Sequence, residues 1–459
     1  MKGRHARKDK IYWKPAIATL LVISLILFLF FHFHDDKDQD DYLSYSSITG
    51  QIAAVGDETI RLRLNDGTEY LFSIAGVIDS NHGLLAGNQI TIYYDGIPDD
   101  SKDDIQSVKV KKYIVEENSI ANNDNNHINK EIATLLQNMS LEEKIAQMFL
   151  VRCPEINQSE FVRSFQPGGY LLFADDFENK SQEEVTAEIN SYQSDADIAM
   201  FMAVDEEGGT VVRVSQFFRD ERFQSPQLIY SQGGYQAILK DTKEKDDFLK
   251  QFGINLNMAP VCDVSLDSQD FMYARSFGKD AEATGKYVET VIKQMNKDQM
   301  GSCLKHFPGY GNNKDSHNQP VYDNREIEII KSNDWIPFQQ GIENNANMIM
   351  VCHNIITSAD HNLPASLSLT VHEMLRNDLS YDGIIIIDDL AMESVSVLDS
   401  DENNAVKAIQ AGNDMIISSD ANNQYQAIYH AVKNGEISEN QIDLSVLRIL
   451  AYKQSLEII

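Results

Sequence analysis

The pattern of hydrophobic and polar positions changes twice along the chain. Residues 16–34 contain no Asp, Glu, Lys or Arg, and a stretch of this length can cross a bilayer. Residues 44–116 alternate apolar and polar positions around turn residues, as in "TIRLRLNDGTEYLFSI", which is typical of β-hairpins. From residue 131 onward, short apolar runs alternate with helix-like stretches. The pattern therefore predicts a membrane span, a small all-β domain and a larger α/β domain.

The α/β region contains eight short apolar runs. They are "MFLVRC", "YLLFA", "IAMFMAV", "INLNMAP", "SCLK", "MIMVCH", "IIIID" and "DMIISS". Helix-like stretches such as "DAEATGKYVETVIKQMNKD" lie between them. Eight buried strands that alternate with helices predict an α/β fold of the (β/α)8 TIM-barrel type. A doubly wound open sheet is the alternative that this pattern leaves open.

The charge of the chain narrows the classes of partner. Acidic residues outnumber basic residues by 70 to 39, which gives a formal net charge of −31. A surface of this charge repels nucleic acid, so we expect no nucleic-acid partner. Basic residues are concentrated in residues 1–15, directly before the apolar segment. By the positive-inside rule, this end is expected to stay in the cytoplasm while the rest of the chain is exported.

These patterns predict six segments in chain order. They are a cytoplasmic basic segment (1–15), a transmembrane anchor (16–34), an acidic spacer (35–43), a small β-barrel or β-sandwich domain (44–116), a polar linker (117–130) and the α/β domain (131–459). A cleavable signal peptide is the alternative for the anchor, but no A-x-A-like cleavage site follows it. We therefore expect a single-pass protein of the cell membrane, with its large domain extracellular. The four cysteines lie in or beside apolar runs, so we expect buried free thiols.

Charged side chains follow several of the predicted barrel strands. Asp205 ends the third strand, Arg275 lies beyond the fourth, Lys305 and His306 end the fifth, and Asp388 ends the seventh. Because the active site of a TIM barrel lies at the carboxyl ends of its strands, we expect these side chains to meet. Charged groups form strong hydrogen bonds with hydroxyls, so the predicted cluster suits a carbohydrate ligand.

Several of these groups have more than one interpretation. Asp388 could attack an anomeric carbon, or it could cap the following helix. Asp315 and His317 in "KDSH" could form a proton-transferring pair, or they could belong to a solvated turn. Arg213 could contact a sugar or form an ion pair with Asp205. The histidines lack the paired spacing of metal ligands, so we expect neither a metal nor a cofactor.

Stretches along residues 131–459 resemble glycoside hydrolase family 3, in the order of that family. They are "DEEGG", "GINLNMAPVCDV", "RSFG", "KHFPGYG…DSH", "PASLS" and "IIIIDDLAM". The resemblance implies a (β/α)8 catalytic domain, with Asp388 as nucleophile and His317 as acid/base assisted by Asp315. It also implies a set of sugar-binding residues: Asp205, Arg275, Lys305 and His306, with Arg213 as a further contact.

The "DSH" motif resembles the single-domain, NagZ-type β-N-acetylglucosaminidase branch of that family. This implies a retaining, exo-acting enzyme that hydrolyses terminal β-linked GlcNAc, and export would make peptidoglycan or muropeptides its substrates. The alternatives are a β-glucosidase or β-xylosidase, a β-GlcNAc phosphorylase, and an inactive protein that binds wall glycan. The chain departs from the family pattern at Thr210, Tyr310 and Ile387, and three residues rather than four separate Gly311 from Asp315.

Overall fold

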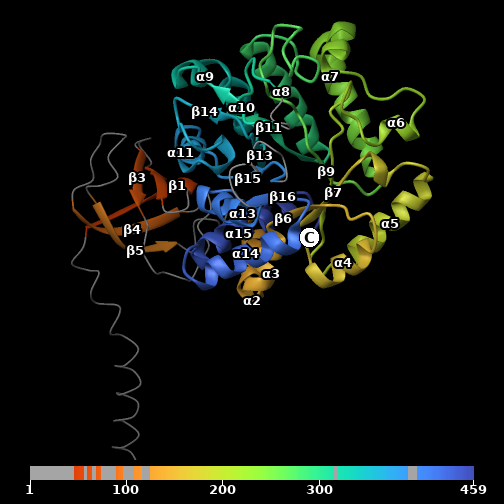
Figure 1. Cartoon of the computed structure of the whole chain (residues 1–459). Helices are drawn as coiled ribbons and strands as arrows, with labels where there is room; N and C mark the ends of the chain where they lie inside the picture. The colour runs from red at the N-terminus through yellow and green to blue at the C-terminus, as the bar shows by residue number, and fades with distance from the viewer. Residues whose placement is uncertain are drawn as a thin grey trace, which may run out of the picture.

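The computed structural model combines a small antiparallel sheet, a connecting helix and a large α/β barrel (Figure 1). The residues that it describes are 46–55, 59–64, 69–73, 89–96, 108–115, 125–314, 319–390 and 401–459. Statements below about what the structure contains refer to these residues.

The small sheet has five antiparallel strands within residues 44–116, where the sequence predicts β-structure. The strands are β1 (Ser46–Val55), β2 (Thr59–Arg63), β3 (Glu69–Ser73), β4 (Gln89–Gly96) and β5 (Val108–Val115). They pair in the order β3-β2-β1-β4-β5. Alternate side chains of a strand point to the same face, and one face buries Ile60, Leu62, Phe72, Ile90 and Ile92.

Helix α2 (Asn125–Asn138) leads from the small sheet to the barrel. It begins inside residues 117–130, for which the sequence predicts a polar linker. Its apolar face carries Ile132 and Leu136, which are buried in the main core of the barrel. The last part of the chain before the barrel is therefore packed on the barrel surface.

The barrel has eight strand positions, and each predicted apolar run forms one of them. The strands are β6 (Phe149–Arg152), β7 (Gly169–Leu172), β8 (Phe201–Val204), β9 (Leu256–Asn257), β10 (Gly301–Ser302) with β11 (Leu304–Phe307), β13 (Met348–Val351), β15 (Ile384–Ile387) and β16 (Met415–Ser418). The fifth position is split, because β10 pairs with β9 while β11 pairs with β13. The two halves of this split strand are the two ends of a nearly closed parallel ring, and this arrangement with its helices fits a TIM-type barrel.

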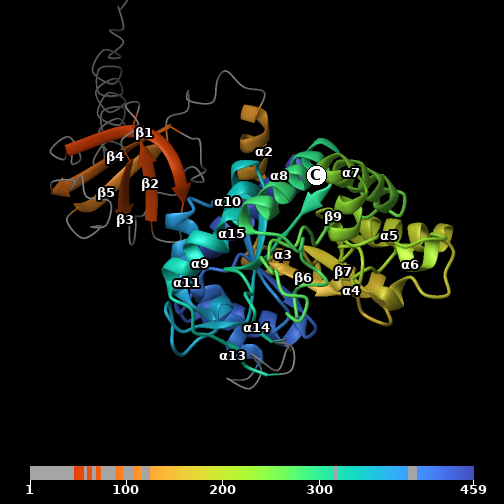
Figure 2. The same ribbon diagram turned by 90° about the horizontal axis from the view of Figure 1, so that it is seen from above.

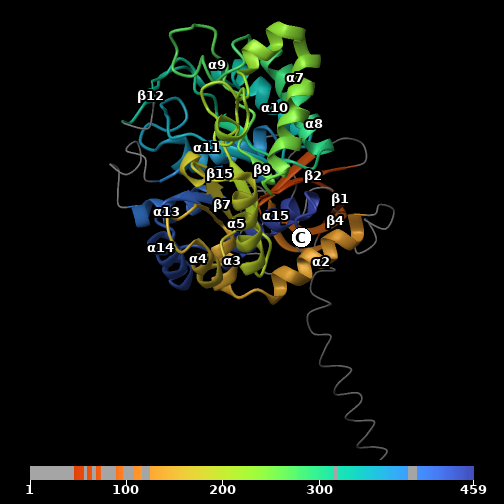
Figure 3. The same ribbon diagram turned by 90° about the vertical axis from the view of Figure 1, so that its right-hand side faces the viewer.

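Helices surround the ring of strands on its outer side (Figures 2 and 3). The α-helices are α3 (Leu141–Gln147), α4 (Gln158–Phe165), α5 (Gln182–Asp195), α6 (Ser215–Phe218), α7 (Pro226–Lys250), α8 (Ala281–Lys297), α9 (Ile327–Asn333), α10 (Trp335–Glu343), α11 (Leu369–Glu373), α13 (Asp401–Ala411), α14 (Ala421–Lys433) and α15 (Glu439–Ser455). Short helical turns occur at η3 (Ala174–Asp176), η4 (Ala365–Leu367) and η5 (Met374–Asp378). A strand β12 (Tyr322–Asp323) pairs with β14 (Ile355–Ile356) outside the ring.

The core of the barrel explains why its strands are continuously apolar. Both faces of each strand are covered, and the four isoleucines of β15 are fully buried. The four cysteines are free and buried, as the sequence predicts.

The small sheet contacts one side of the barrel (Figures 1 and 2). Leu444 of α15 is buried in the apolar core of the small sheet. One guanidinium nitrogen of Arg61 donates a hydrogen bond to the carbonyl of Asn377 in η5, at 2.8 Å. The two units thus share an apolar contact and a polar one.

The predicted fold needs correction at its N-terminal transmembrane helix. None of the helices that the structure describes is both long enough and apolar enough to cross a membrane. Helix α7 has 25 residues, but it carries the charged sequence "KDTKEKDD" and cannot be accommodated in a hydrocarbon layer about 30 Å thick. The segment for which the anchor is predicted, residues 16–34, lies outside the described residues.

Candidate active site

A cavity of about 440 Å³ opens at the carboxyl ends of the barrel strands. Its polar and aromatic lining comprises Arg152, Phe173, Asp205, Arg213, Phe271, Arg275, Lys305, His306, Asp388 and Asp389. Six of the eight site residues predicted from the sequence therefore lie in one cavity. The other two, Asp315 and His317, lie outside the described residues. A volume of this size is typical of small-ligand sites.

Lys305 forms the floor of the cavity, between two carboxylates from the loop after β8. Its Nζ lies 2.6 Å from Oδ1 of Asp205 and 2.7 Å from Oε1 of Glu207. Burial lowers the pKa of Lys305, but the negative charges of Asp205 and Glu207 outweigh burial, and the net effect raises the pKa. The ammonium group therefore stays charged and fixed in place.

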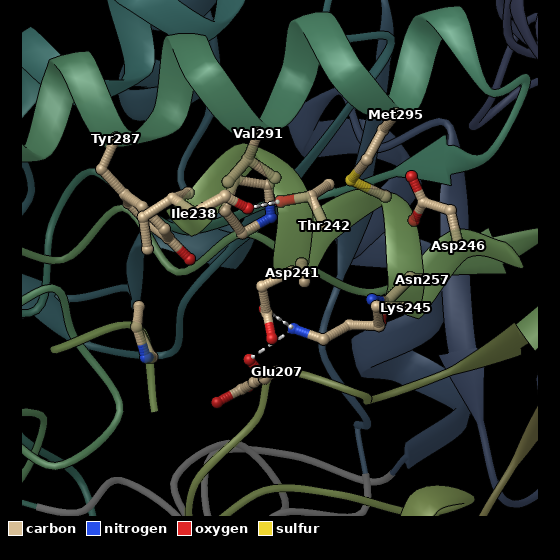
Figure 4. Close-up of a pocket in the computed structure, with 13 residues that line it drawn as sticks. Glu207, Ile238, Asp241, Thr242, Lys245, Asp246, Asn257, Tyr287, Val291 and Met295 are labelled. Atoms are coloured by element: carbon tan, nitrogen blue, oxygen red, sulfur yellow. Dashed lines mark hydrogen bonds and ion pairs between the residues drawn. The ribbon is translucent and has the colours of Figure 1, made fainter. Parts of the chain in front are cut away.

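Glu207 links Lys305 to Arg275. Its carboxylate accepts two hydrogen bonds from the Arg275 guanidinium, at 3.0 and 2.7 Å. Burial raises the pKa of Glu207, but the charges of Lys305 and Arg275 outweigh burial and hold it well below its usual range. The backbone of Glu207 is held by a second lysine: Nζ of Lys245 donates to the carbonyl of Glu207 at 3.2 Å and lies 3.3 Å from Oδ2 of Asp241 (Figure 4). Glu207 is thus fixed through both its backbone and its side chain.

His306 is oriented by Asp263, which lies beyond β9. Nδ1 of His306 lies 2.8 Å from Oδ2 of Asp263. The same carboxylate accepts from the backbone N–H groups of His306, at 3.2 Å, and Tyr310, at 2.8 Å. With the Asp263 carboxylate as acceptor, Nδ1 of His306 carries the proton and Nε2 is left as an acceptor. Nε2 lies 3.4 Å from a terminal nitrogen of Arg275. The ring can therefore present Nε2 to a ligand.

Asp388 follows β15 directly and is only partly buried. The backbone N–H of Asp389 donates to Oδ1 of Asp388 at 2.8 Å. The carbonyl of Asp389 lies 3.3 Å from Nε2 of His353, and Nδ1 of His353 lies 2.8 Å from Oγ of Ser366. The side chain of Asp389 accepts a hydrogen bond from Ser419. These contacts fix the end of the strand that presents Asp388 to the cavity.

Two arginines lie near the same aromatic ring in the lining of the cavity. The guanidinium of Arg152, at the end of β6, lies 4.5 Å from the centre of the Phe173 ring. The guanidinium of Arg213 lies 5.5 Å from the same ring, and 3.9 Å from Oδ2 of Asp205. Arg152 is exposed and has no carboxylate partner among the described residues.

Sequence reasoning missed Arg152 and Glu207. A signal for Glu207 was present, because a lysine at the end of a buried strand needs a nearby carboxylate to compensate its charge. The segment "DEEGG" offers three acids, and no periodicity tells which of them pairs with Lys305. Arg152 ends an apolar run in the same manner as Lys305 and could have been found by that criterion. No group of three or more potential metal ligands occurs in the part of the chain that the structure describes.

Comparisons with known proteins show the family of this chain. A family model described as "Glycosyl hydrolase family 3 N terminal domain" matches residues 140–452. A beta-hexosaminidase of Haemophilus influenzae is 31% identical over 302 residues, covering 62% of this chain and 82% of the relative. A beta-hexosaminidase of Photobacterium profundum is 33% identical over 265 residues, covering 57% and 77%.

Solved structures show the same barrel. A glycoside hydrolase family 3 beta-N-acetylglucosaminidase from Paenibacillus sp. matches with a TM-score of 0.65 and 25% identity. The match covers 70% of this chain and 63% of that protein, so the chain spans less than two thirds of its length. A beta-N-acetylhexosaminidase from Beutenbergia cavernae shares the fold, with a TM-score of 0.62 and 22% identity over 69% of this chain and 99% of that one. The family model spans most of the barrel and confirms the resemblance seen in the sequence: the chain belongs to glycosyl hydrolase family 3, the glycoside hydrolases.

Proposed function

We propose that this protein is a retaining, exo-acting β-N-acetylglucosaminidase. The proposal rests on one observation: the partly buried carboxylate of Asp388 lines the same cavity as Asp205, Lys305 and Arg275. Lys305 forms ion pairs with Asp205 and Glu207, and Glu207 also pairs with Arg275. The names of the curated relatives and of the Paenibacillus structure support the choice of sugar.

The reaction follows from the chemistry of these groups. Asp388 attacks the anomeric carbon, so that a carbon–oxygen bond to the enzyme forms while the bond to the leaving oxygen breaks. His317, assisted by Asp315, gives a proton to the leaving oxygen. Water then attacks the anomeric carbon, gives its proton back to His317 and releases Asp388. Two displacements at the same carbon give net retention of configuration.

The network supplies binding groups for a terminal sugar. Lys305 and Arg275 are donors, and Asp205 is an acceptor, for hydroxyls at the closed end of the cavity. Nε2 of His306 adds a further polar contact. Because these groups hold one another in place, a sugar meets them already oriented, which lowers the entropic cost of binding.

We further propose that the natural substrate is peptidoglycan or a muropeptide. This finer assignment is supported by Arg152, whose exposed guanidinium lies on the cavity wall without an ion-pair partner among the described residues. A muramyl group in the leaving position carries a lactyl carboxylate where no stem peptide is attached, and the attached peptide ends in a carboxylate of its own; this guanidinium can pair with either group.

The test of the reaction is replacement of Asp388 by Ala. We expect turnover of 4-nitrophenyl β-GlcNAc to fall by about 1,000-fold or more, because the nucleophile is lost. Asp420→Ala is the matched control, since Asp420 follows the eighth strand but does not line the cavity. Wild-type turnover by Asp388→Ala would contradict the assignment. Parallel assays with β-glucoside and β-xyloside, with and without phosphate, identify the sugar and separate hydrolysis from phosphorolysis.

The test of the substrate class is Arg152→Ala. We expect KM for a GlcNAc–MurNAc disaccharide to rise by about fivefold, which is the upper range for an exposed ion pair. KM for chitobiose, which has no carboxylate, should stay unchanged. An equal rise for both disaccharides would show that Arg152 does not recognise the carboxylate.

A further inference from the structure

The lining of the cavity includes an aromatic ring that is open to solvent. Phe271, in the segment between β9 and α8, lines the cavity and is 38% exposed. Lys305 and His306 of the same lining are only 2% and 6% exposed, so Phe271 lies nearer to the mouth of the cavity than they do. A large apolar side chain left open to solvent in a ligand cavity is typical of a surface that a ligand covers.

A series of ring contacts connects Phe271 to His306. The ring of Phe271 packs against that of Tyr310, with 5.8 Å between their centres, and the Tyr310 ring packs edge to face against His306 at 5.9 Å. Tyr310 is 3% exposed, and its backbone N–H donates to the carboxylate of Asp263, which also orients His306. The support of the exposed ring is therefore built together with a group of the proposed sugar site.

The backbone around Phe271 is held by hydrogen bonds on both sides of this residue. The carboxylate of Asp270 accepts from Oγ of Ser265 at 3.0 Å, and its backbone carbonyl accepts from the N–H of Tyr273 at 3.1 Å. The carbonyl of Tyr273 in turn accepts from the side-chain amide of Gln227 in α7. Because the ring is presented by a fixed turn, a ligand that covers it meets little further cost in conformational entropy.

The position of the ring indicates which part of a substrate reaches it. In the proposed reaction, the terminal sugar occupies the closed end of the cavity with Asp205, Lys305 and Arg275, and the leaving group points toward the mouth. Arg152, which is also exposed, ends the first strand of the ring, whereas Phe271 follows the fourth. A leaving group at the mouth can thus meet a guanidinium and an aromatic ring that come from separate strands.

The shape of a β-linked amino sugar suits an aromatic surface. A pyranose ring with equatorial substituents presents axial C–H groups on its two faces, so these faces are apolar. When such a face leaves water and packs against an aromatic ring, apolar surface is buried on both partners. The ring of Phe271 has no polar atom, so it favours a flat sugar ring through contact area alone.

We propose that Phe271 is a specificity-determining residue, whose ring stacks on the sugar ring of the leaving group. This role rests on the proposed function and deepens it. The preferred substrates are those in which a second pyranose follows the terminal GlcNAc, rather than β-GlcNAc attached to a small alcohol. Tyr310, which is buried and does not line the cavity, supports the Phe271 ring from behind.

The test is replacement of Phe271 by Ala in the full chain. KM for chitobiose should rise by about tenfold, because the contact with the second sugar ring is lost. The value of kcat should stay within about twofold, because this contact is made in the ground state and in the transition state alike. The inhibition constant of methyl β-GlcNAc, whose leaving group has no ring, should change by less than about twofold, because its sugar binds only at the closed end.

Two further variants at the same position separate the flat ring from apolar bulk. Phe271→Trp restores a flat aromatic surface and should recover most of the wild-type KM for chitobiose. Phe271→Leu keeps an apolar side chain against Tyr310 but has no flat face. If Phe271→Ala does not fold, Phe271→Leu should show the rise in KM in its place.

A matched control excludes a general effect of removing an exposed ring. Phe217 of α6 is also 38% exposed but does not line the cavity. Phe217→Ala should leave both KM for chitobiose and the inhibition constant of methyl β-GlcNAc unchanged. A rise in KM as large as that of Phe271→Ala would overturn the inference.

The remaining outcomes distinguish the role of Phe271 from the function beneath it. If Phe271→Ala raises KM and the inhibition constant equally, the ring contacts the terminal sugar, and the inference is overturned while the proposed function stands. An unchanged KM for chitobiose has the same consequence. If the wild type releases GlcNAc neither from chitobiose nor from 4-nitrophenyl β-GlcNAc, the proposed function fails, and the inference fails with it.

Discussion

Lys305 and Glu207 show how single residues at the cavity depend on partners from other strands. Lys305 lies within β11, whereas its two carboxylates follow β8. The neighbouring Glu206 points elsewhere and accepts from the backbone N–H groups of Arg213 and Val214, both at 2.8 Å. The sequence places these acids side by side but cannot assign them, because a loop has no fixed period. Only the fold decides which carboxylate compensates Lys305.

Replacement of Glu207 by Gln tests this compensation. We expect a loss of about 3 kcal/mol in the free energy of unfolding at pH 7, because two buried cations lose a shared partner. The pKa of Glu207 is lowered in the folded state. Its contribution is therefore present above the unfolded pKa of about 4.3 and should disappear as the pH falls below that value.

Urea denaturation curves measure the effect. They are recorded at about one-unit intervals of pH between about pH 3 and pH 7, a range that includes the unfolded pKa of Glu. Glu244→Gln is the control, because Glu244 pairs with Arg219 at 2.7 Å on the exposed surface. That variant should lose less than about 1 kcal/mol. A loss of the same size in both variants would contradict the role given to Glu207.

At the scale of elements, the pattern of apolar residues was sufficient to predict where the strands lie, but it was insufficient to predict which strands pair. The eight runs match eight strand positions because strands buried on both faces must be apolar throughout. The run "GSCLKHF" gives no sign that it divides into β10 and β11, because the division depends on which neighbour each half pairs with. Helix α2 was missed in part, since its first residues are polar.

For the candidate site too, the sequence predicted the positions of several residues but not the contacts between them. Asp205 and Asp388 were found because each directly follows a strand, and Lys305 and His306 were found because they follow an apolar run, although both lie within β11. Asp263 was visible beyond the fourth strand, but its role as the partner of His306 depends on contacts between distant segments. The roles of Asp315 and His317 stay predictions, since both residues lie outside the described part of the chain.

For the whole molecule, stability should depend on pH through a buried lysine distant from the cavity. Lys453 of α15 is fully buried beside Phe201, and its Nζ donates to Oε1 of Gln147 at 2.7 Å. Burial lowers the pKa of Lys453 to about 7. Above that pH the unfolded chain binds more protons at this site than the folded chain, so the site favours folding increasingly as the pH rises.

Comparison with Lys453→Met isolates this effect. Between about pH 7 and pH 8.5, the free energy of unfolding of the wild type should rise relative to the variant by up to about 1.4 kcal/mol per pH unit. Above this window, the buried cysteines, whose pKa values are raised by burial, oppose the trend in both proteins. Denaturation curves across the window measure the difference, and Lys433→Met on the exposed surface should show none. Parallel curves for wild type and Lys453→Met would refute the prediction.

The split fifth strand limits how this chain could be rearranged. Gly301–Ser302 and Leu304–Phe307 form the two ends of the nearly closed ring of strands, and the second of these segments also carries Lys305 and His306. A circular permutation that opened the chain at Cys303 would thus disrupt the fifth strand position and displace two residues of the cavity lining at once. New termini beyond α14, in the exposed turn at Asn434 and Gly435, would leave both intact.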